Sequence, residues 1–411
     1  MQSRDNRRHG YRWLWGASAG AALGDGLSST TFPLLIASQT RDPLIVSLLQ
    51  VATGLPWLLF GLVAGTLVDR WDRRAVMWRT DLARVCIVLV LGVLVARGHA
   101  PVVVVLFAAF LLACGSTLIR SAAPALLPTL VPREQLARAN GRLQAGATLS
   151  GSFVGPAAGS VLHSFSASAP VLAQTVAFIA SAVCVGRLPA AASVEAARSS
   201  RRSIWIETAE GLRWLFAHRV LRSVAVGTVL LAASTGVLLA VLVIHVLDVL
   251  DVPAAGYGLL IAVYAGGSVM GSLLAARLRR RLGTNRCLLI SALLGTVSIA
   301  VLAVAPSAVL AGAALIVLGV ATMLWNILAV TVRQEFTPDH LLGRVTSAFA
   351  VVGVGTAPIA APLGGIVASL TSTSVAIGFA AMLCALACIP VGRLPDLDRV
   401  GHTPPETPPH P

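Results

Sequence analysis

The sequence predicts an all-α integral membrane protein with twelve transmembrane helices in two pseudo-symmetric bundles of six. Three observations support this prediction, and the first is the amino-acid composition. Of the 411 residues, 56% are hydrophobic and 12% are charged, and the mean hydropathy is +0.83. A soluble domain carries about 25% charged residues. The other two observations are a series of long apolar segments and a repeat that relates the two halves of the chain.

The apolar segments are each long enough to cross a hydrocarbon core of about 30 Å, for which about 20 helical residues suffice. Helices are expected because lipid offers the backbone no hydrogen-bond partner, and the segments lack the alternation of a β-barrel strand. The predicted spans are 13–37, 44–68, 80–97, 101–122, 143–163, 169–188, 221–246, 255–276, 287–305, 307–330, 341–368 and 373–392.

The distribution of arginine predicts the orientation, because the chain contains no lysine. With the N-terminus in the cytoplasm, every arginine except Arg41 and Arg97 falls in an inner loop, a tail or an adjoining helix end. Arg84 is counted among those that follow the second span. This bias predicts a multi-pass protein of the cell membrane with both termini cytoplasmic. The net charge of +14 is therefore spread over short loops, and no folded basic domain for nucleic acid is predicted.

A repeat with a period of 206 residues relates the two halves. Identical residues that it aligns include Gly61 with Gly267, Gly65 with Gly271, Arg73 with Arg279, Arg74 with Arg280, and Pro156 with Pro362. One offset that serves several landmarks indicates two six-span halves in parallel orientation.

Four regions are predicted along the chain. Residues 1–188 form the N-terminal bundle and 221–393 form the C-terminal bundle. The cytoplasmic linker 189–220 contains an amphipathic helix from Ile204 onward, which is expected to lie at the inner membrane surface or to dock a partner. The tail 394–411 is proline-rich and is expected to be disordered.

The segment between the second and third spans turns from apolar to basic within a few residues, as GTLVDRWDRR. Together with twelve spans in two related halves, this motif resembles the major facilitator superfamily. The stretches LLPTLVPREQLARANGRLQ and EGLRWLFAHRVLR resemble one branch of it, the bacterial drug, macrolide and siderophore exporters of the enterobactin-exporter type. The resemblance implies a cytoplasmic gate made of Gly61, Gly65, Asp69, Arg70, Arg73, Arg74 and Arg120.

Within this gate, Asp69 is expected to pair with Arg120 or to cap span 11 while the cytoplasmic side is closed. A solvated carboxylate is the alternative. Arg73 and Arg74 are expected either to take part in the contacts that close this gate or only to set the orientation of the chain in the membrane. Two features depart from the family pattern. Asp72 stands where the family usually has a glycine. The arginine that many proton-coupled members carry midway along span 4 is missing, and Arg120, the only basic residue of that span, is interpreted as lying at its cytoplasmic end.

Asp25 is the candidate for proton coupling or substrate binding. It lies near the middle of span 1, where a carboxylate costs about 2.5–3.5 kcal/mol on insertion scales, so it is expected to line a polar cavity. No other ionisable side chain is placed near the midplane by the sequence. The alternative is a structural carboxylate bonded to Ser28, Ser29 or a neighbouring helix.

Two further groups are candidates. In span 5, the motif GxxxGPxxG is typical of a thin, bent helix that packs closely against span 8; it consists of Gly151, Gly155, Pro156 and Gly159. On span 10, Trp325 and Asn326 are candidate cavity residues.

The function predicted is secondary active export of apolar or amphipathic small molecules, drug-, macrolide- or siderophore-like, by alternating access with proton antiport. An importer or a dedicated exporter of one endogenous metabolite is the alternative, and a non-transporting receptor or scaffold a remote one. Without lysine there is no GxxxxGK[ST] loop, and no metal-like spacing or nucleophile motif occurs, so neither enzyme activity nor a cofactor is predicted. The expected partners are the substrate, protons and the lipid bilayer, and a monomer is expected.

Overall fold

The computed structural model describes residues 2–188, 204–394 and 397. Side chains are described throughout these ranges except at 2–8, 61–70, 133, 204–208 and 339–340. The described residues are helical or lie in short turns, without a β-strand. They form two compact units, which are treated separately below: unit 1 contains 1–201 and 243–262, and unit 2 contains 202–242 and 263–411.

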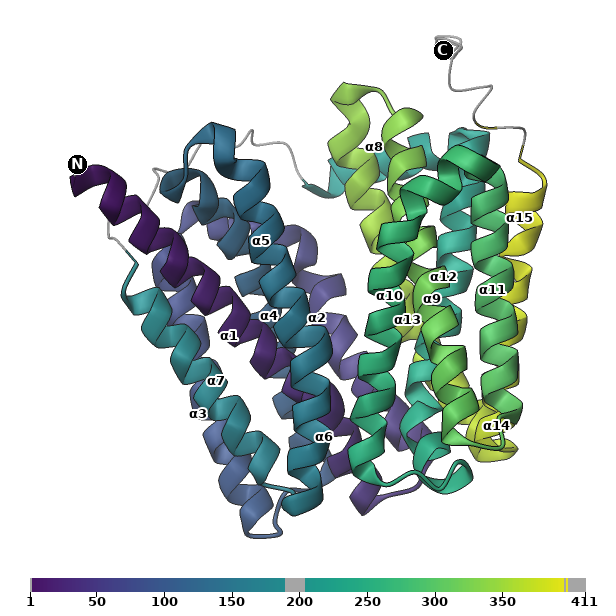
Figure 1. Cartoon of the computed structure of the whole chain (residues 1–411), viewed down its shortest axis with the longest axis horizontal. Coiled ribbons are helices and arrows are strands. Elements are labelled where there is room, and N and C mark those ends of the chain that lie inside the picture. The colour runs from purple at the N-terminus through teal and green to yellow at the C-terminus, as the bar shows by residue number, and fades with distance from the viewer. Residues whose placement is uncertain (1, 189–203, 395–396, 398–411) are drawn as a thin grey trace. The chain divides into compact units, whose positions relative to one another are not determined.

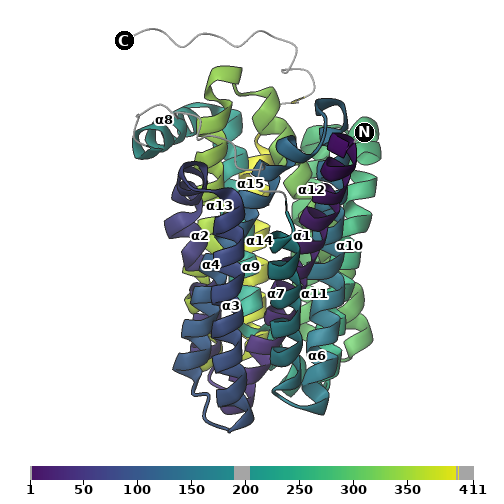
Figure 2. The same ribbon diagram turned by 90° about the vertical axis from the view of Figure 1, so that its left-hand side faces the viewer.

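Unit 1 is built on the first nine described helical segments of the chain and one later segment, 243–262. Its helix α1 packs along α7, α6 and α4, and α3 packs between α4 and α7. Figure 1 shows α1 alongside α7, and Figure 2 shows α3 beside α4. The elements are α1 (Gln2–Gln39), α2 (Pro43–Arg70), α3 (Arg73–Ala96), α4 (Val102–Leu130), the 3-10 turn η1 (Arg133–Gln135), α5 (Leu136–Thr148), the π-helix η2 (Leu149–Val154), α6 (Gly155–Phe165) and α7 (Ala169–Gly186).

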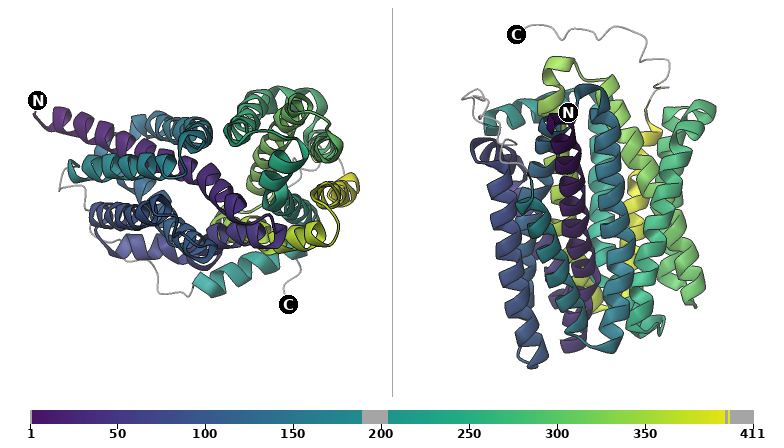
Figure 3. Two further views of the ribbon diagram at one scale, coloured as in Figure 1. Left: turned by 90° about the horizontal axis from the view of Figure 1, so that it is seen from below. Right: turned by 60° about the vertical axis from the view of Figure 1, so that its left-hand side comes forward.

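Unit 2 contains the remaining helices. Within it, α11 packs against α12 and α14, and α8 packs against α13. The left panel of Figure 3 shows the green and yellow helices of unit 2 close to end-on and α8, in teal, from the side. The elements are α8 (Ile204–Ala217), α9 (Arg219–Ile244), the π-helix η4 (His245–Val249), α10 (Ala254–Leu282), α11 (Thr284–Val304), α12 (Ala308–Glu335), α13 (Asp339–Leu370), α14 (Thr373–Leu386) and α15 (Cys388–Gly392). The chain enters unit 1 at residue 243, near the end of α9, and leaves it at 262 within α10.

The predicted fold class is confirmed, and each of the twelve predicted spans lies on a helix or a short series of helices. Among the described residues, nine helices are long and apolar enough to cross a membrane by themselves. The other three spans have local reasons for falling short. Helix α1 is rich in Gly, Ala and Ser, the first half of α3 is charged, and the fifth span is divided by η2.

The third span begins earlier than the sequence suggested. Asp72 caps α3 by accepting a hydrogen bond from the backbone N–H of Arg74 (3.0 Å). The helix therefore starts at Arg73, and Arg84 lies three turns inside it. Arg73 donates to the Ala125 carbonyl of α4 (2.8 Å). The Arg74 side chain donates to carbonyls at the end of α7, at 2.5 Å to Gly186. Both arginines thus join the first turn of α3 to neighbouring helices of unit 1.

The fifth span is shaped by its small residues. A Cβ added at Gly155 would lie 2.6 Å from the Cα of Gly26, so α6 and α1 touch through their main chains. The Pro156 carbonyl accepts a hydrogen bond from the Thr30 hydroxyl of α1 (3.2 Å). On another side of α6, the Ser160 hydroxyl reaches the carbonyl of Ala255 at the start of α10 (3.1 Å). The motif therefore packs against α1 as well as against the beginning of span 8.

The linker region contains helix α8, whose second half is part of the core of unit 2. Leu215 is fully buried in that core. Gly211 packs against the main chain of Arg344 on α13, and Glu210 forms an ion pair with the Arg344 guanidinium (2.7 Å). The sequence predicted that the apolar face of this helix lies at the inner membrane surface or docks a partner. In the structure, part of that face packs against α13 and the core of unit 2. The proline-rich tail lies outside the described residues, apart from 394 and 397.

Candidate functional site

The candidate site begins with a buried ion pair between α1 and α3. The Arg84 side chain is 1% exposed and donates through Nη2 to Oδ1 of Asp25, whose side chain is 23% exposed. The Ser116 hydroxyl of α4 donates to the same carboxylate oxygen (2.7 Å) and accepts from Arg84 Nη2 (2.9 Å). Three helices are thus joined by one carboxylate. The exposed fraction shows that Asp25 alone of the pair is open to the adjoining cavity.

A second carboxylate lies behind Arg84, one helical turn away on α3. Oδ1 of Asp81 is 3.7 Å from Nη1 of Arg84, and the Asp81 side chain is fully buried. The Ser181 hydroxyl of α7 lies 2.5 Å from Oδ2 of Asp81 and 2.9 Å from the carbonyl oxygen of Ala17. Arg84 is therefore flanked by two carboxylates that differ in their access to the cavity.

The guanidinium rests on an aromatic ring. Cζ of Arg84 is 3.9 Å from the ring centroid of Phe178 on α7, a cation–π geometry. Two glycines make room for this pair. A Cβ added at Gly115 would lie 2.9 Å from Cδ of Arg84, and one added at Gly24 would overlap the Phe178 ring. Gly24, next to Asp25, thus makes room for the Phe178 ring, and Gly115, next to Ser116, makes room for the Arg84 side chain.

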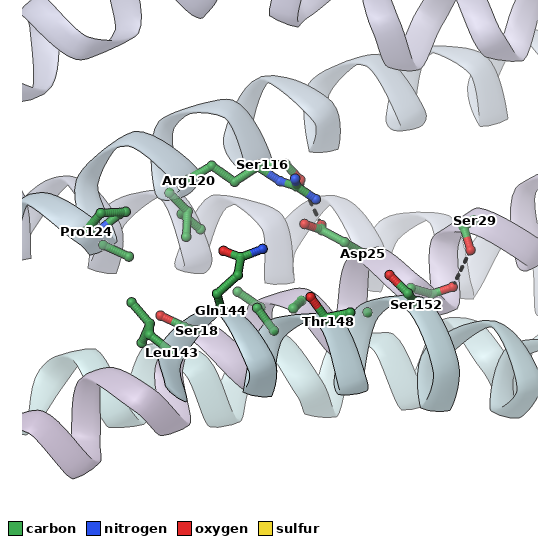
Figure 4. A pocket seen from close by; sticks show the side chains of 17 residues that line it. Ser18, Asp25, Ser29, Ser116, Arg120, Pro124, Leu143, Gln144, Thr148 and Ser152 are labelled. Carbon is green, nitrogen blue, oxygen red and sulfur yellow. Dashed lines mark hydrogen bonds between the residues drawn. The ribbon is translucent and has the colours of Figure 1, made fainter. Parts of the chain in front are cut away.

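The cavity beside Asp25 has a volume of about 430 Å³ and is enclosed by α1, α4, α5 and η2. Figure 4 shows Asp25 and Arg120 pointing into it, with Gln144 and Thr148 on the facing helix. Arg120 lies one turn from Ser116 on α4 and ten residues before the end of that helix, deeper than the sequence indicated. It forms no ion pair or hydrogen bond with any residue that the structure describes.

A cavity of about 450 Å³ occurs in unit 2, and its walls repeat those of the first. The 206-residue repeat pairs its α12 and α13 residues with α4 and α5 residues of the first cavity: Thr322 with Ser116, Trp325 with Ile119, Asn326 with Arg120, Phe349 with Leu143, Ala350 with Gln144 and Val354 with Thr148. Trp325 is 3% exposed and donates its indole N–H to the Thr228 hydroxyl (3.1 Å). The candidate residues Trp325 and Asn326 both line this cavity.

The residues of unit 2 that correspond to Asp25 and Arg84 are identified by the helix contacts that their neighbouring glycines make. Gly26, next to Asp25, abuts the main chain of Gly151; Gly236, next to Thr235, abuts Ala357, the repeat partner of Gly151. Thr235 on α9 therefore takes the place of Asp25 on α1. By the same reasoning Gly295 on α11 takes the place of Arg84, because it packs against Ala321 and Cys384, the repeat partners of Gly115 and Phe178.

The predicted gate is only partly visible. Gly61, Gly65, Asp69 and Arg70 lie on α2, where the structure describes the backbone but not the side chains. The pairing of Asp69 with Arg120 therefore falls outside the described residues. Arg73 and Arg74, by contrast, bind helix carbonyls within unit 1, as described above.

Sequence reasoning missed Arg84 and Asp81. Arg84 was assigned to a helix end because the apolar run was started at residue 80. The signal that identifies both residues is the capping aspartate Asp72, which moves the helix start back and brings Arg84 to mid-helix. The interpretation of Asp25 as the only ionisable group at its depth is therefore wrong.

This arrangement suits proton-linked switching. A carboxylate open to a cavity can be protonated from it, and protonation removes the charge that holds Arg84 in place. No group of three or more metal-ligating side chains is found among the described residues. A polar cavity with an internal ion pair in a helical bundle is an arrangement that membrane transporters use for substrate and ion sites.

The chain belongs to the transmembrane secretion effector family of the major facilitator superfamily, whose model matches residues 6–411. The predicted family is thereby confirmed, and the chain is a multi-pass membrane protein of a superfamily of transporters.

Several curated relatives are efflux proteins by name. The chain is 29% identical to the multidrug efflux pump Tap of Mycobacterium bovis over 92% of both chains. It is 27% identical to the enterobactin exporter EntS of Salmonella typhimurium, over 92% of this chain and 91% of that protein. The match to macrolide efflux protein A of Streptococcus pyogenes is 27% identical and spans 40% of each chain.

Solved structures share the fold at low sequence identity. The nucleoside transporter NupG has a TM-score of 0.71 and 13% identity, with 95% of this chain and all of that chain covered. A bacterial homologue of the iron transporter ferroportin, in an inward-facing state, has a TM-score of 0.74 and 16% identity, with 93% and 98% covered. These likenesses concern the fold alone.

Proposed function

We propose that this transporter exports apolar or amphipathic small molecules, drug-, macrolide- or siderophore-like, by alternating access in exchange for protons. The relatives that match over most of the chain support the direction, because their names describe efflux. The observation that carries the coupling is Asp25, a carboxylate that faces a cavity on one side and a buried arginine on the other.

The energetics are adequate for such an exchange. One charge moving down a potential of 100 mV supplies about 2.3 kcal/mol. At about 1.4 kcal/mol per factor of ten, this sustains a substrate gradient of roughly fifty-fold. A single proton-binding carboxylate is therefore sufficient for export at this level.

The test compares proton-driven accumulation with gradient-free exchange in inverted vesicles. Asp25→Asn mimics the protonated carboxyl, so exchange of labelled substrate should persist while accumulation under a proton gradient falls to the level of empty vesicles. Asp25→Glu should retain part of the coupling with a shifted pH optimum. The matched control is Asp248→Asn, which makes the same change at a half-exposed carboxylate paired with Arg41 (3.5 Å). Proton-driven accumulation at the wild-type level in Asp25→Asn would exclude Asp25 as the coupling group.

Three alternatives to this proposal predict different experimental results. If Asp25 only binds cationic substrates, Asp25→Asn loses cations but still accumulates a neutral compound under the gradient. If the protein serves one endogenous metabolite, as the name of the enterobactin exporter suggests for that relative, unrelated drugs should not compete with one another for export. An importer would accumulate substrate in right-side-out rather than inverted vesicles.

The gate is a separate part of the proposal. We infer that Asp69 closes the cytoplasmic side by pairing with a group present in one conformational state only. Asp69→Asn should then leave folding intact, raise cysteine accessibility at the cytoplasmic mouth and slow transport. Unchanged accessibility with full transport would remove Asp69 from the mechanism.

We also propose that the protein is a monomer in the cell membrane, with both termini in the cytoplasm.

A further inference from the structure

The buried ion pair leaves two facing polar atoms without a hydrogen bond. Nη1 of Arg84 and Oδ1 of Asp81 are both buried, neither has a hydrogen-bond partner among the described residues, and they lie 3.7 Å apart. Nη2 of the same guanidinium is bound to Asp25 and Ser116. A hydrogen bond between nitrogen and oxygen is about 2.9 Å long, so a movement of less than about 1 Å would complete the second pair.

We propose that Arg84 is a two-position counterion. When Asp25 is ionised, Arg84 binds it; when Asp25 takes a proton from the cavity, Arg84 moves onto Asp81. One proton is added to the Asp25 carboxylate, and no other bond is made or broken except these hydrogen bonds and ion pairs. The inference rests on the proposed role of Asp25, and it assigns to Asp81 the role of a positioning residue.

The surroundings of the pair favour such a movement. A buried arginine without a counterion is strongly unfavourable, so a proton could bind Asp25 only at great cost if Asp81 were absent. The Ser181 hydroxyl lies at Oδ2 of Asp81, which leaves Oδ1 directed at Arg84. The flat ring of Phe178 lies under the guanidinium and can remain in contact with it in both positions.

Other ionisable groups near the network are few among the described residues. Arg120 of α4 lines the cavity on the Asp25 side, and its positive charge favours the ionised carboxylate. Cys184 lies on α7, one turn beyond Ser181, and its thiol is a weak hydrogen-bonding group. Neither group can replace Asp81 as an anion for Arg84.

The first test is the pH dependence of export in Asp81→Asn. With Asp81 neutral, Arg84 has Asp25 as its single counterion, so Asp25 should hold its charge to a lower pH. The pH at which proton-driven export is half-maximal should fall by about one unit, which is a tenfold change in proton affinity. Asp248→Asn serves as the matched control and should leave this pH in place. A merely structural Asp81 would lower the rate equally at every pH, and an unmoved midpoint in folded Asp81→Asn would overturn the proposal.

A structure of Asp25→Asn provides the second test and does not depend on the folding of Asp81→Asn. Because asparagine carries no charge, Arg84 should move and shorten the Nη1–Oδ1 distance from 3.7 Å to about 2.9 Å. An Arg84 that stays 3.7 Å from Asp81 would overturn the proposal.

The outcomes separate this inference from the proposed function. Proton-driven export that survives in Asp25→Asn would remove the proposed role of Asp25. Export that is lost in Asp25→Asn, while Arg84 stays in place in that variant, would retain Asp25 as the proton site and reject only the second position of Arg84.

Discussion

The cavities of unit 1 and unit 2 have nearly the same volume, about 430 and 450 Å³, and their walls consist largely of repeat-related positions. Their chemistry differs. The first has Asp25 and Arg120 in its wall and Arg84 behind it, whereas the second has Thr235, Asn326 and Gly295 at the corresponding places. The charged residue in the second wall, Arg333, comes from the last turn of α12.

The comparison shows that the repeat preserves helix register and cavity size without preserving charge. Where unit 1 has the ion pair, unit 2 has the uncharged residues Thr235 and Gly295. Trp325 and Phe349 line its cavity at the repeat positions of Ile119 and Leu143. A cavity of this fold therefore does not require buried charges for its construction. The charges in unit 1 are better explained by what the cavity does than by what holds it open.

The largest effect is expected from removing the shared counterion. Arg84→Met leaves Asp25 and Asp81 without a buried cation, which typically costs about 3–5 kcal/mol, so little folded protein should be recovered. The triple variant, Asp25→Asn with Asp81→Asn and Arg84→Met, should fold again, because it lacks the whole charged group, as unit 2 does at the corresponding positions. Fluorescence-detected size exclusion and thermal unfolding measure both. A triple variant no more stable than Arg84→Met would show that unit 1 needs its charges for folding.

A smaller effect is expected at the contact between α1 and α6. Gly155→Leu should cost about 1–3 kcal/mol, because the new side chain meets the main chain of Gly26. Unit 2 has Ala361 at the repeat position, so its helices tolerate a Cβ there. Pro156→Ala should be milder than Gly155→Leu. Thermal stability and transport rate are the measurements, with Gly141→Leu as control, because a Cβ at Gly141 meets no atom within 4 Å. Equal effects at the two glycines would contradict the packing argument.

The third prediction concerns the cavity of unit 2. Trp325→Phe removes the indole donor to Thr228 and should cost about 0.5–1.5 kcal/mol. Because Trp325 lines the cavity of unit 2, the variant should change the KM for substrate. The pH of half-maximal export should stay in place, because this cavity lacks the Asp25 ion pair. A shift of that pH would mean that the two cavities share the coupling role.

The smallest effect is expected where α8 meets α13. Glu210→Gln removes the ion pair with Arg344, whose side chain is 29% exposed, so stability should fall by only about 0.2–1 kcal/mol and less at high salt. In unit 1 the repeat position is Arg138, an exposed residue, and Arg138→Gln should have no measurable effect. Thermal unfolding at low and high salt tests both. A larger loss for Arg138→Gln would reverse the comparison.

The sequence predicted the spans, the repeat and Asp25 because each depends on local pattern: long apolar runs, matching landmarks, and a carboxylate in the middle of one run. It did not predict the partner of Asp25, since the charged first half of α3 reads as loop unless Asp72 is recognised as a cap. The pairing of the cavities also requires contacts. The 206-residue repeat alone aligns Asp25 with Leu231, whereas helix packing places Thr235 there.

The glycine contact between α1 and the fifth span has a consequence for how specificity can change. Because Gly26 meets Gly151 and Gly155 main chain to main chain, the distance between these helices is set by the backbone. The side chains that line the cavity, such as Gln144 and Ser152, do not take part in this contact. The residues that set the helix spacing thus differ from those that line the cavity. Substitutions at the lining positions can therefore change which substrate fits, while the spacing of the two helices and the depth of Asp25 remain the same.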